Sequence, residues 1–269
     1  DIQKFLYERE DNTMKRKLLS ALLATAMTMT VVAGTGIAVS ADGEAVVSTV
    51  MFSDPDTMDP GRADDDQKNS IILECQESLV RLIDGKLTNA GAESYETSED
   101  GLTWTFHLRD NKYSDGTPVV AADYVNSIRR VFDPEVNCHN AGIFYCIAGG
   151  EDFNTGSGAK EDVGAKAVDD KTLEITLTEP IPYFAQLLTF ANITPVPESK
   201  TEGENNSSYG AIVEDLAQSG PYYISEWTRG SKVVLKKNPN YWDAENIKLD
   251  EIDMILAQDE NTRQQLFDQ

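Results

Sequence analysis

The chain has 269 residues, of which 46 are acidic and 23 are basic, so its formal net charge is −23 at pH 7. This charge repels phosphate backbones and anionic membrane surfaces, and nucleic-acid binding is therefore not expected. Hydrophobic residues make up 40% of the chain and include 3 Trp, 10 Tyr and 9 Phe, which is enough for a packed core in one large domain or two small ones.

The first 41 residues are expected to lie outside the folded domain. Residues 14–41 have the layout of a secretory signal peptide: three basic residues, a nearly uncharged apolar segment, and an A-x-A-like cleavage site at Val39-Ser40-Ala41. Residues 1–13 precede the first methionine and are interpreted as an upstream extension. A membrane-spanning helix is disfavoured because the apolar segment is shorter than the ~20 residues that a span requires.

The three cysteines matter because an exported protein enters an oxidising compartment. The spacing of Cys138 and Cys146 allows a disulfide across a short loop, although spacing alone does not fix the geometry. Cys75 falls in an apolar helical stripe and is expected to be a small core residue.

The first predicted elements are a strand and a helix. Residues 46–52 are β-branched and apolar and stop at Ser53-Asp54-Pro55, where proline prevents further ladder pairing. Residues 69–82 carry Ile72, Cys75, Leu79 and Leu82 at helical spacing. We predict an amphipathic helix that packs on the strand.

A second strand and helix follow. Residues 102–108 alternate apolar and polar side chains, which predicts a half-buried strand. Residues 113–118 form a turn that contains glycine and proline. A helix is predicted at 121–132, where Val125, Ile128 and Phe132 are buried and Asp133-Pro134 ends the helix.

The remaining elements are short. We expect a glycine-rich surface loop at 149–164, followed by a hairpin whose strands are 165–168 and 172–177. A helix is expected at 184–188. Three further strands are expected: one that begins at Tyr222, one at 232–237 and one at 252–256. Helices and strands do not alternate regularly. The fold class is therefore α/β, with mixed sheets of the α+β kind.

Catalytic and metal-binding motifs are absent from the sequence. There is no G-x-x-x-x-G-K-[ST], H-E-x-x-H or G-x-S-x-G pattern. His107 lies on the outward face of a strand and His139 in a loop, so a metal site or a Ser/His relay would need a tertiary contact that no motif indicates. We expect no catalytic residue, no metal and no cofactor.

Acidic residues gather after the first strand. Asp54, Asp56 and Asp59 do not keep calcium-loop spacing, because two prolines intervene and the distal Glu is missing, and turn formation explains them better. Asp64-Asp65-Asp66 is interpreted as a solvated loop rather than a cation site, since consecutive like charges usually mark solvated loops.

Several motifs together resemble the solute-binding proteins of peptide-transporting ABC importers, solute-binding protein family 5. Their order and spacing agree from about Val46 to the last residue. The motifs are Asp54-Pro-Asp-Thr-Met-Asp-Pro60, Glu77-Ser-Leu-Val-Arg81, Asp100-Gly-Leu-Thr-Trp-Thr-Phe-His-Leu-Arg109, Tyr113-Ser-Asp-Gly-Thr-Pro118, Asp169-Asp-Lys-Thr-Leu-Glu-Ile-Thr-Leu177, Ser219-Gly-Pro-Tyr222 and Asn238-Pro-Asn-Tyr-Trp242. Glu179-Pro-Ile-Pro-Tyr-Phe184 and Thr194-Pro-Val-Pro197 are typical of the oligopeptide-binding branch.

The resemblance implies a periplasmic-binding-protein-like fold of class II, in which two lobes close on an extended peptide. Residues 42–269 then form the first lobe, with an accessory subdomain at about 85–200, and the chain is expected to stop before the second lobe. The implied function is extracytoplasmic binding of oligopeptides for delivery to the membrane permease of an ABC importer. The implied protein is a monomer that uses no cofactor and does no chemistry on its ligand.

The resemblance also points to ligand-binding residues. By position, Asp64, Asp65 and Asp66 match the loop that lies along the peptide. Asn140 falls where such proteins often carry a ligand-facing aromatic residue. The acidic partner of the peptide amino group is expected in the second lobe.

Two alternatives remain open. The same fold is able to bind nickel, haem or an oligosaccharide. The second alternative is an exported hydrolase whose catalytic half lies in the missing part of the chain. The reading frame downstream would discriminate, because a second lobe supports the binding protein and a G-x-S-x-G or zinc motif supports the enzyme.

The resemblance departs from lipid-anchored relatives at the leader. Those relatives carry a cysteine after a Leu/Val-Ala-Gly box, whereas here Val32-Ala33-Gly34 is followed by Thr35, which has no thiol for a thioether. A lipid anchor is therefore not expected. The expected location is the periplasm or the extracellular side of the membrane, at the cell surface through the transporter.

We predict that the exported protein begins at Asp42, because Val39 and Ala41 offer small side chains at the two positions that a signal peptidase reads. Intact-mass measurement of the exported protein should give the mass of a chain that starts there. A retained leader or the added mass of a lipid would contradict this.

Overall fold

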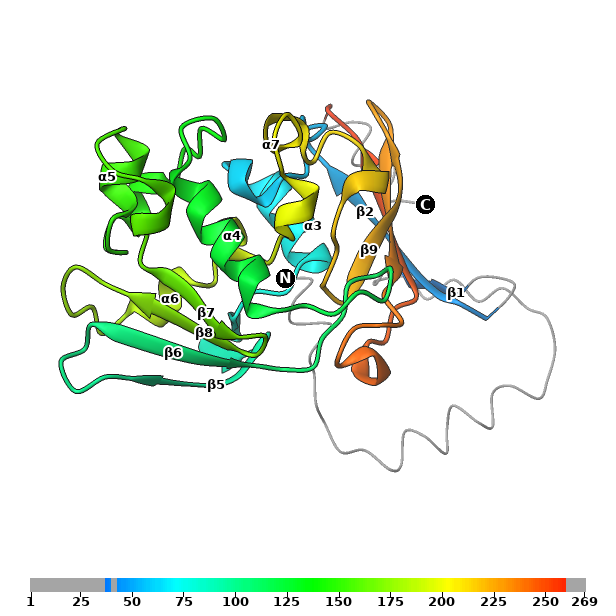
Figure 1. Cartoon of the computed structure of the whole chain (residues 1–269). Helices are drawn as coiled ribbons and strands as arrows, with labels where there is room; N and C mark the ends of the chain where they lie inside the picture. The colour runs from blue at the N-terminus through cyan, green and yellow to red at the C-terminus, as the bar shows by residue number, and fades with distance from the viewer. Residues whose placement is uncertain (1–36, 40–42, 260–269) are drawn as a thin grey trace.

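The computed structural model describes residues 37–39 and 43–259, so most of the predicted leader and residues 260–269 lie outside the described ranges. A five-stranded sheet and a four-stranded sheet lie on opposite sides of the described chain, with helices α3 and α4 between them (Figure 1). No helix within these ranges is long and apolar enough to cross a membrane.

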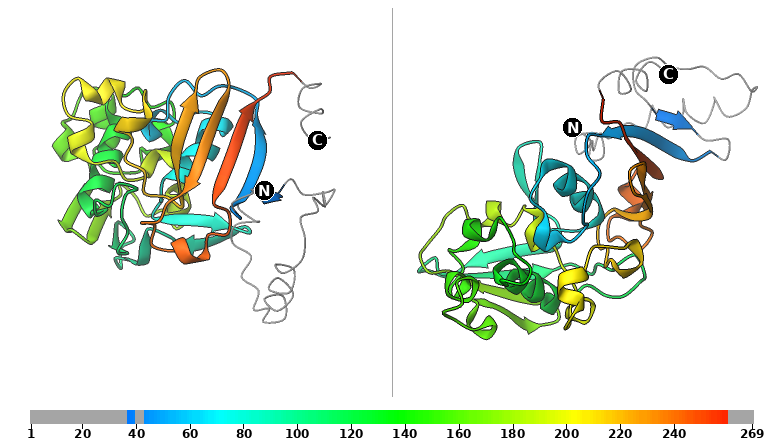
Figure 2. Two further views of the ribbon diagram at one scale, coloured as in Figure 1. Left: turned by 90° about the vertical axis from the view of Figure 1, so that its right-hand side faces the viewer. Right: turned by 90° about the horizontal axis from the view of Figure 1, so that it is seen from above.

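The five-stranded sheet has the order β1-β2-β11-β10-β9 (Figure 2). Its only parallel pair joins β2 (Ala45–Met51) to β11 (Glu251–Leu256), two segments that are about two hundred residues apart in the sequence. β10 (Lys232–Lys237) and β9 (Tyr222–Thr228) continue the sheet in antiparallel fashion, and β1 (Ile37–Val39) pairs with the outer edge of β2. The sheet is thus mixed, as the sequence predicted.

The strands predicted at 46–52, 232–237 and 252–256 are confirmed to within one residue at each end. Helix α3 (Asp66–Cys75) covers this sheet, and its Ile71 and Ile72 join a buried core with side chains of β9, β10 and β11. The sequence therefore identified this first core.

The prediction of one helix over 69–82 is wrong beyond Cys75. The last carbonyl groups of α3 are satisfied from outside the helix, because Gly220 donates its N–H to the Cys75 carbonyl at 2.9 Å and the Arg81 guanidinium donates to two further carbonyls. With those acceptors filled, the chain turns away and forms β3 (Val80–Ile83). A side chain at position 220 would lie within 2.6 Å of this helix end, so glycine is required there.

The four-stranded sheet is antiparallel, with the order β5-β6-β8-β7. Its strands are β5 (Ala92–Thr97), β6 (Thr103–Leu108), β8 (Thr172–Thr176) and β7 (Ala165–Asp169). Helix α4 (Ala121–Phe132) lies across one face of this sheet (Figure 1). Together they enclose a second hydrophobic core.

The sequence predicted most of this second unit. The strand at 102–108 alternates buried and half-buried side chains as expected, the hairpin at 165–177 is confirmed, and α4 has the predicted bounds. The hairpin of β3 with β4 (Lys86–Asn89) and strand β5 were not predicted. β4 and β5 are mostly exposed and polar, so they carry no alternation that a sequence pattern would reveal.

The connections contain short helices. They are η1 (Pro60–Arg62), η2 (Ala141–Phe144), α5 (Gly150–Asn154), η3 (Lys160–Asp162), α6 (Phe184–Leu187), η4 (Ala191–Ile193), η5 (Glu198–Lys200), α7 (Asn205–Ser208), η6 (Val213–Asp215) and η7 (Ala244–Asn246). The helix predicted at 184–188 corresponds to α6.

The segment 149–164 is more ordered than the predicted loop. It contains α5 and η3, and Gly150 packs so closely on the Phe132 ring that a Cβ at this position would lie 2.6 Å from the ring. Gly149 adopts a φ of 70°, which an L side chain rarely tolerates. These glycines therefore serve close packing and a left-handed turn rather than a flexible loop.

The three cysteines are free thiols, so the disulfide that the spacing of Cys138 and Cys146 allows does not form. Cys138 is buried beside Asn192, whose side-chain amide lies 3.7 Å from its sulfur. Cys146 lies at the other end of η2, where its carbonyl accepts a hydrogen bond from Thr178. Burial raises the pKa of the Cys138 thiol to about 11. Cys75 is buried in the core, as predicted.

Glu74 provides a test of this packing, because one of its carboxylate oxygens is buried and has no hydrogen-bond partner among residues 37–39 and 43–259. Burial raises the pKa of Glu74. Because the pKa of Glu74 is higher in the folded than in the unfolded chain, the stability of the fold decreases as the pH rises above the pKa of the unfolded carboxyl group. We predict that Glu74→Gln is more stable than the wild type at pH 7 and that the difference vanishes as the pH falls to about 4.

Urea unfolding at a series of pH values measures this difference. Exposed Glu93→Gln is the matched control, and it should show no gain at pH 7. A Glu74→Gln variant that is equally stable at pH 7 would contradict the prediction.

Candidate functional site

The candidate site lies at the carboxyl ends of the parallel pair β2 and β11. In open α/β sheets, ligands bind in the crevice outside such strand ends. The loop 52–65 leaves β2 at this edge and leads into α3, and Met51 pairs with Leu256 at the end of the neighbouring strand. The acidic cluster identified in the sequence lies on this loop.

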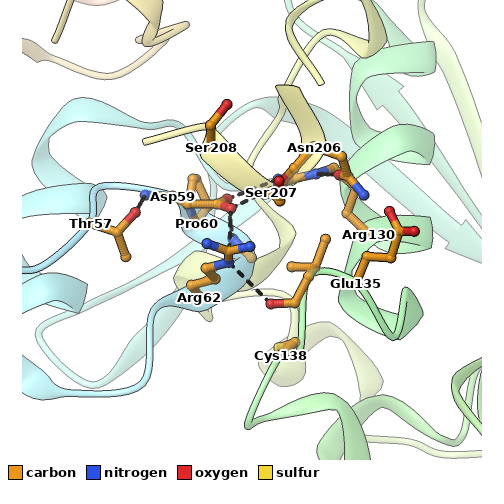
Figure 3. Close-up of polar contacts among 12 residues, drawn as sticks. Thr57, Asp59, Pro60, Arg62, Arg130, Glu135, Cys138, Asn206, Ser207 and Ser208 are labelled. Atoms are coloured by element: carbon orange, nitrogen blue, oxygen red, sulfur yellow. Dashed lines mark hydrogen bonds and ion pairs between the residues drawn. The ribbon is translucent and has the colours of Figure 1, made fainter. Parts of the chain in front are cut away.

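A buried ion pair holds the middle of the loop. Asp59 is fully buried, and its two carboxylate oxygens each accept a hydrogen bond of 2.8 Å from the Arg130 guanidinium on α4 (Figure 3). The same carboxylate accepts the N–H of Gly61 at 2.9 Å and so caps η1. The bidentate geometry fixes the orientation of the loop against the second core.

A third segment completes this ion pair. The Asn206 side chain on α7 accepts a hydrogen bond from the Arg130 guanidinium at 2.9 Å and donates one to Asp133 at 3.0 Å. Tyr209 lies beneath the guanidinium, with its ring centroid 5.4 Å away. Residues 59, 130 and 206 thus join three segments that are widely separated in the sequence (Figure 3).

Lys68 organises the end of the loop. Its ammonium lies 2.9 Å from Asp56, 3.4 Å from Asp65 and in contact with Asp64, and the Lys68 side chain is only 6% exposed. The hydrogen bond from this ammonium lowers the pKa of Asp56 and of Asp64. The acidic segment is therefore arranged around a buried cation and is not the freely solvated loop that consecutive aspartates suggest.

The three predicted aspartates have different roles within this arrangement. Asp64 contacts Lys68 and also lies 2.7 Å from the ring of His139. Asp65 caps α3 by accepting the N–H of Lys68 at 2.8 Å. Asp66 occupies the first turn of α3 and is exposed.

Asn140 lies against the same loop. The segment of Asn140 and the acidic segment 64–66, which the sequence analysis assigned to the ligand, are therefore close together in space. Its side chain donates to the Ala63 carbonyl at 3.0 Å and to the Asn192 side chain at 3.1 Å. Asn192 in turn donates to the carbonyls of Pro60 and Ala63. The two asparagines therefore tie the 60–63 segment to η2 and η4.

Sequence reasoning missed Lys68, Arg130 and Asn192 as parts of this region. Each is a common surface residue type, and no motif in the sequence singles it out as part of this region. Their burial next to carboxylates or carbonyls is a tertiary property. The exposure of the Ile143 and Phe190 side chains also follows only from the structure.

The chemistry available here is hydrogen bonding and charge. Within residues 37–39 and 43–259, no group of three or more His, Cys, Asp or Glu side chains has the arrangement of a metal site. The carboxylates of Asp56, Asp59, Asp64 and Asp65 are bound to Lys68, Arg130 or His139 and position the loop, whereas exposed Asp66 adds negative charge at this edge. Such an edge suits a ligand with backbone amides and positive charge.

Comparison with known proteins identifies relatives across most of the chain. Residues 86–269 match the family described as bacterial extracellular solute-binding proteins, family 5 Middle. The oligopeptide-binding protein OppA of Bacillus subtilis is 35% identical over 227 residues, which cover 84% of this chain and 42% of that protein.

Solved structures agree with the fold. The structure of Listeria monocytogenes OppA bound to peptide superposes with a TM-score of 0.79 at 34% identity, covering 84% of this chain and 45% of that chain. The substrate-binding domain of an oligopeptide ABC transporter from Bacillus anthracis gives a TM-score of 0.78 at 35% identity, covering 83% and 43%. The chain therefore spans less than half the length of these relatives and has the fold of one part of them.

We predict that Arg130→Met lowers the free energy of unfolding by about 3–5 kcal/mol, because it leaves the Asp59 carboxylate buried without its cation. The neighbouring Arg129→Met is the control, since the Arg129 guanidinium makes no ion pair within the described ranges and its loss should cost much less. Urea unfolding measures both variants. Equal losses would show that the ion pair does not hold the loop.

Proposed function

Because the chain belongs to the bacterial extracellular solute-binding proteins of family 5, we propose that the full-length protein binds oligopeptides outside the cytoplasm and delivers them to the membrane permease of an ABC importer. The observation that carries this proposal is the agreement of the described fold with the peptide-bound Listeria protein at 34% identity. The motifs that indicated the oligopeptide-binding branch, at 179–184 and 194–197, lie within residues 86–269, which match the family.

The proposed ligand edge is the loop 52–65 together with η2. Asp64, Asp65, Asp66 and Asn140 remain the proposed ligand-binding residues. Asp66 is the most available of them, since Asp64 and Asp65 are bound to Lys68 and the side-chain amide of Asn140 is used within the protein. Main-chain hydrogen bonds to an extended peptide would supply affinity, and loosely filled, hydrated pockets would tolerate different side chains.

The proposed domain organisation follows the two cores. Residues 42–269 would form the first lobe, with the accessory subdomain at about 85–200 built around α4 and the four-stranded sheet. The second lobe, which would close over the peptide, would lie beyond these residues. We propose that the protein acts as a monomer without a cofactor and releases its peptide unchanged.

The proposed location is extracytoplasmic. The family description is consistent with export, and the leader at 14–41 would direct it. Thr35 in place of a lipobox cysteine supports a protein without a lipid anchor, associated with the cell surface through its transporter.

We predict that the full-length protein binds peptides without cleaving them, whereas residues 42–269 bind them poorly. A single lobe leaves the other face of the peptide in water, so the peptide loses chain entropy without the buried area that closure supplies. The missing acidic partner of the peptide amino group alone would contribute about 1.5–3 kcal/mol, or one to two decades of affinity.

Titration calorimetry of both proteins with a mixed tri- to pentapeptide library tests this, followed by mass spectrometry of the recovered peptides. Tight binding by residues 42–269 would refute the two-lobe argument. Peptide fragments that accumulate with the full-length protein would instead support a hydrolase, and binding of nickel, haem or an oligosaccharide in place of peptide would support another branch of the family.

A further inference from the structure

Lys68 is an unusual residue for the buried start of a helix. It lies in the first turn of α3, where the helix dipole disfavours a cation, and its side chain is almost fully buried. Burial alone lowers the pKa of a lysine, yet the hydrogen bonds to Asp64 and Asp56 outweigh it and raise the pKa of Lys68. The two carboxylates therefore favour the charged form of the ammonium.

The carboxylates around Lys68 come from both ends of the loop 52–65. Asp56 lies twelve residues before Lys68 in the sequence, and Asp64 and Asp65 lie just before α3. All three direct an oxygen at one ammonium. Without that ammonium, three negative charges would converge on the same point and repel one another at short range.

The arrangement extends to the other proposed ligand-facing segment. One oxygen of Asp64 contacts Lys68, and the other lies 2.7 Å from the ring of His139. His139 precedes Asn140, whose amide holds the Ala63 carbonyl. Contacts from both α3 and the segment that leads into η2 thus set the orientation of the Asp64 side chain.

The bridge between Lys68 and His139 differs in position from the Asp59–Arg130 pair. That pair lies deep in the protein and joins the middle of the loop to α4. Lys68 joins the two ends of the loop to each other, next to exposed Asp66 at the edge of the sheet. The Asp59–Arg130 pair therefore anchors the loop, while Lys68 sets the shape of its outer part.

We propose that Lys68 is a positioning residue for peptide binding: its ammonium acts as a built-in counter-ion that gathers Asp56, Asp64 and Asp65 and so orders the two segments that face the ligand. The inference rests on the proposed function and deepens it, since it assigns the order of the ligand edge to one buried cation. In this proposal Lys68 does not contact the peptide, since only 6% of its side chain is exposed.

The test is chemical rescue of Lys68→Ala in the full-length protein. Truncation to alanine removes three methylene groups and the amine, which n-propylammonium replaces. We expect Lys68→Ala to weaken peptide binding about tenfold or more by calorimetry, in line with the loss of a charge-assisted contact. Propylammonium should recover part of that loss, whereas 1-propanol and tetramethylammonium at the same concentration should not.

Lys160→Ala is the matched control, because Lys160 forms an exposed ion pair with Glu198 away from this edge. This variant should bind like the wild type, with or without propylammonium. Unchanged affinity in Lys68→Ala, or a loss that propylammonium does not reduce, would overturn the proposal, because a purely structural role of the side chain would not respond to the free amine.

Hydrogen exchange without ligand separates this inference from the proposed function. The hydrogen-bonded amides of residues 61–63 and of Ala141 and Ile143 should lose protection in Lys68→Ala and regain it with propylammonium, whether or not the wild type binds peptides. Unchanged protection overturns the proposal on its own. If Lys68→Ala does not fold, Asp64→Asn replaces it, and hydrogen exchange without ligand is then the readout, because Asp64 is itself a proposed ligand contact. Faster exchange of the Ala141 and Ile143 amides is expected, and wild-type exchange at both would overturn the inference.

Discussion

The structure depends on one buried ion pair, Asp59 with Arg130. Its two 2.8 Å hydrogen bonds join the loop that leaves the five-stranded sheet to the helix that covers the four-stranded sheet. Both side chains are buried: the exposed fraction is 0% for Asp59 and 3% for Arg130. Two charges removed from water are tolerated only in complementary geometry, so the pair specifies how the two hydrophobic cores meet at this point.

Further polar residues close the seam between the cores. Glu77 is fully buried, forms a 2.6 Å ion pair with Arg81, and accepts hydrogen bonds from the side chains of Tyr241 and Trp242. Its backbone N–H is held by Ser219, while its carbonyl accepts the Tyr124 hydroxyl from α4. Around Glu77 the seam is therefore built from paired polar groups rather than from a continuous apolar surface, which fixes its geometry more uniquely than apolar packing alone.

This rigidity suits the function that we propose. Ligands commonly bind at loops that follow the carboxyl ends of parallel strands. A peptide binds more tightly to a loop that is already ordered, because no free energy is then lost in ordering the loop on binding. Buried charges at Asp59 and Lys68 order the loop in advance, and the outer carboxylates keep the edge acidic. The high negative charge of the chain is thus partly organised into a defined surface.

The sequence by itself determined the elements whose pattern is local. The strand at 103–108 buries every second side chain, and the apolar side chains of the helix at 121–132 recur at every third to fourth position. Both periods are visible without any partner, whereas the burial of the polar side chains of that helix is not. The motifs likewise determined the family, which the comparison with known proteins confirmed. That the acidic segment at 64–66 faces the ligand stays a proposal.

Tertiary structure alone decided three matters. The helix α3 ends at Cys75 because Gly220, far along the chain, satisfies its terminal carbonyl. The polar strand β5 exists because β6 lies beside it, not because of its own pattern. The aspartates at 64 and 65 are bound rather than free because a buried lysine lies among them. In each case the deciding partner is a hydrogen bond or charge contributed by another part of the fold, and no periodicity in the sequence records where such a partner will lie.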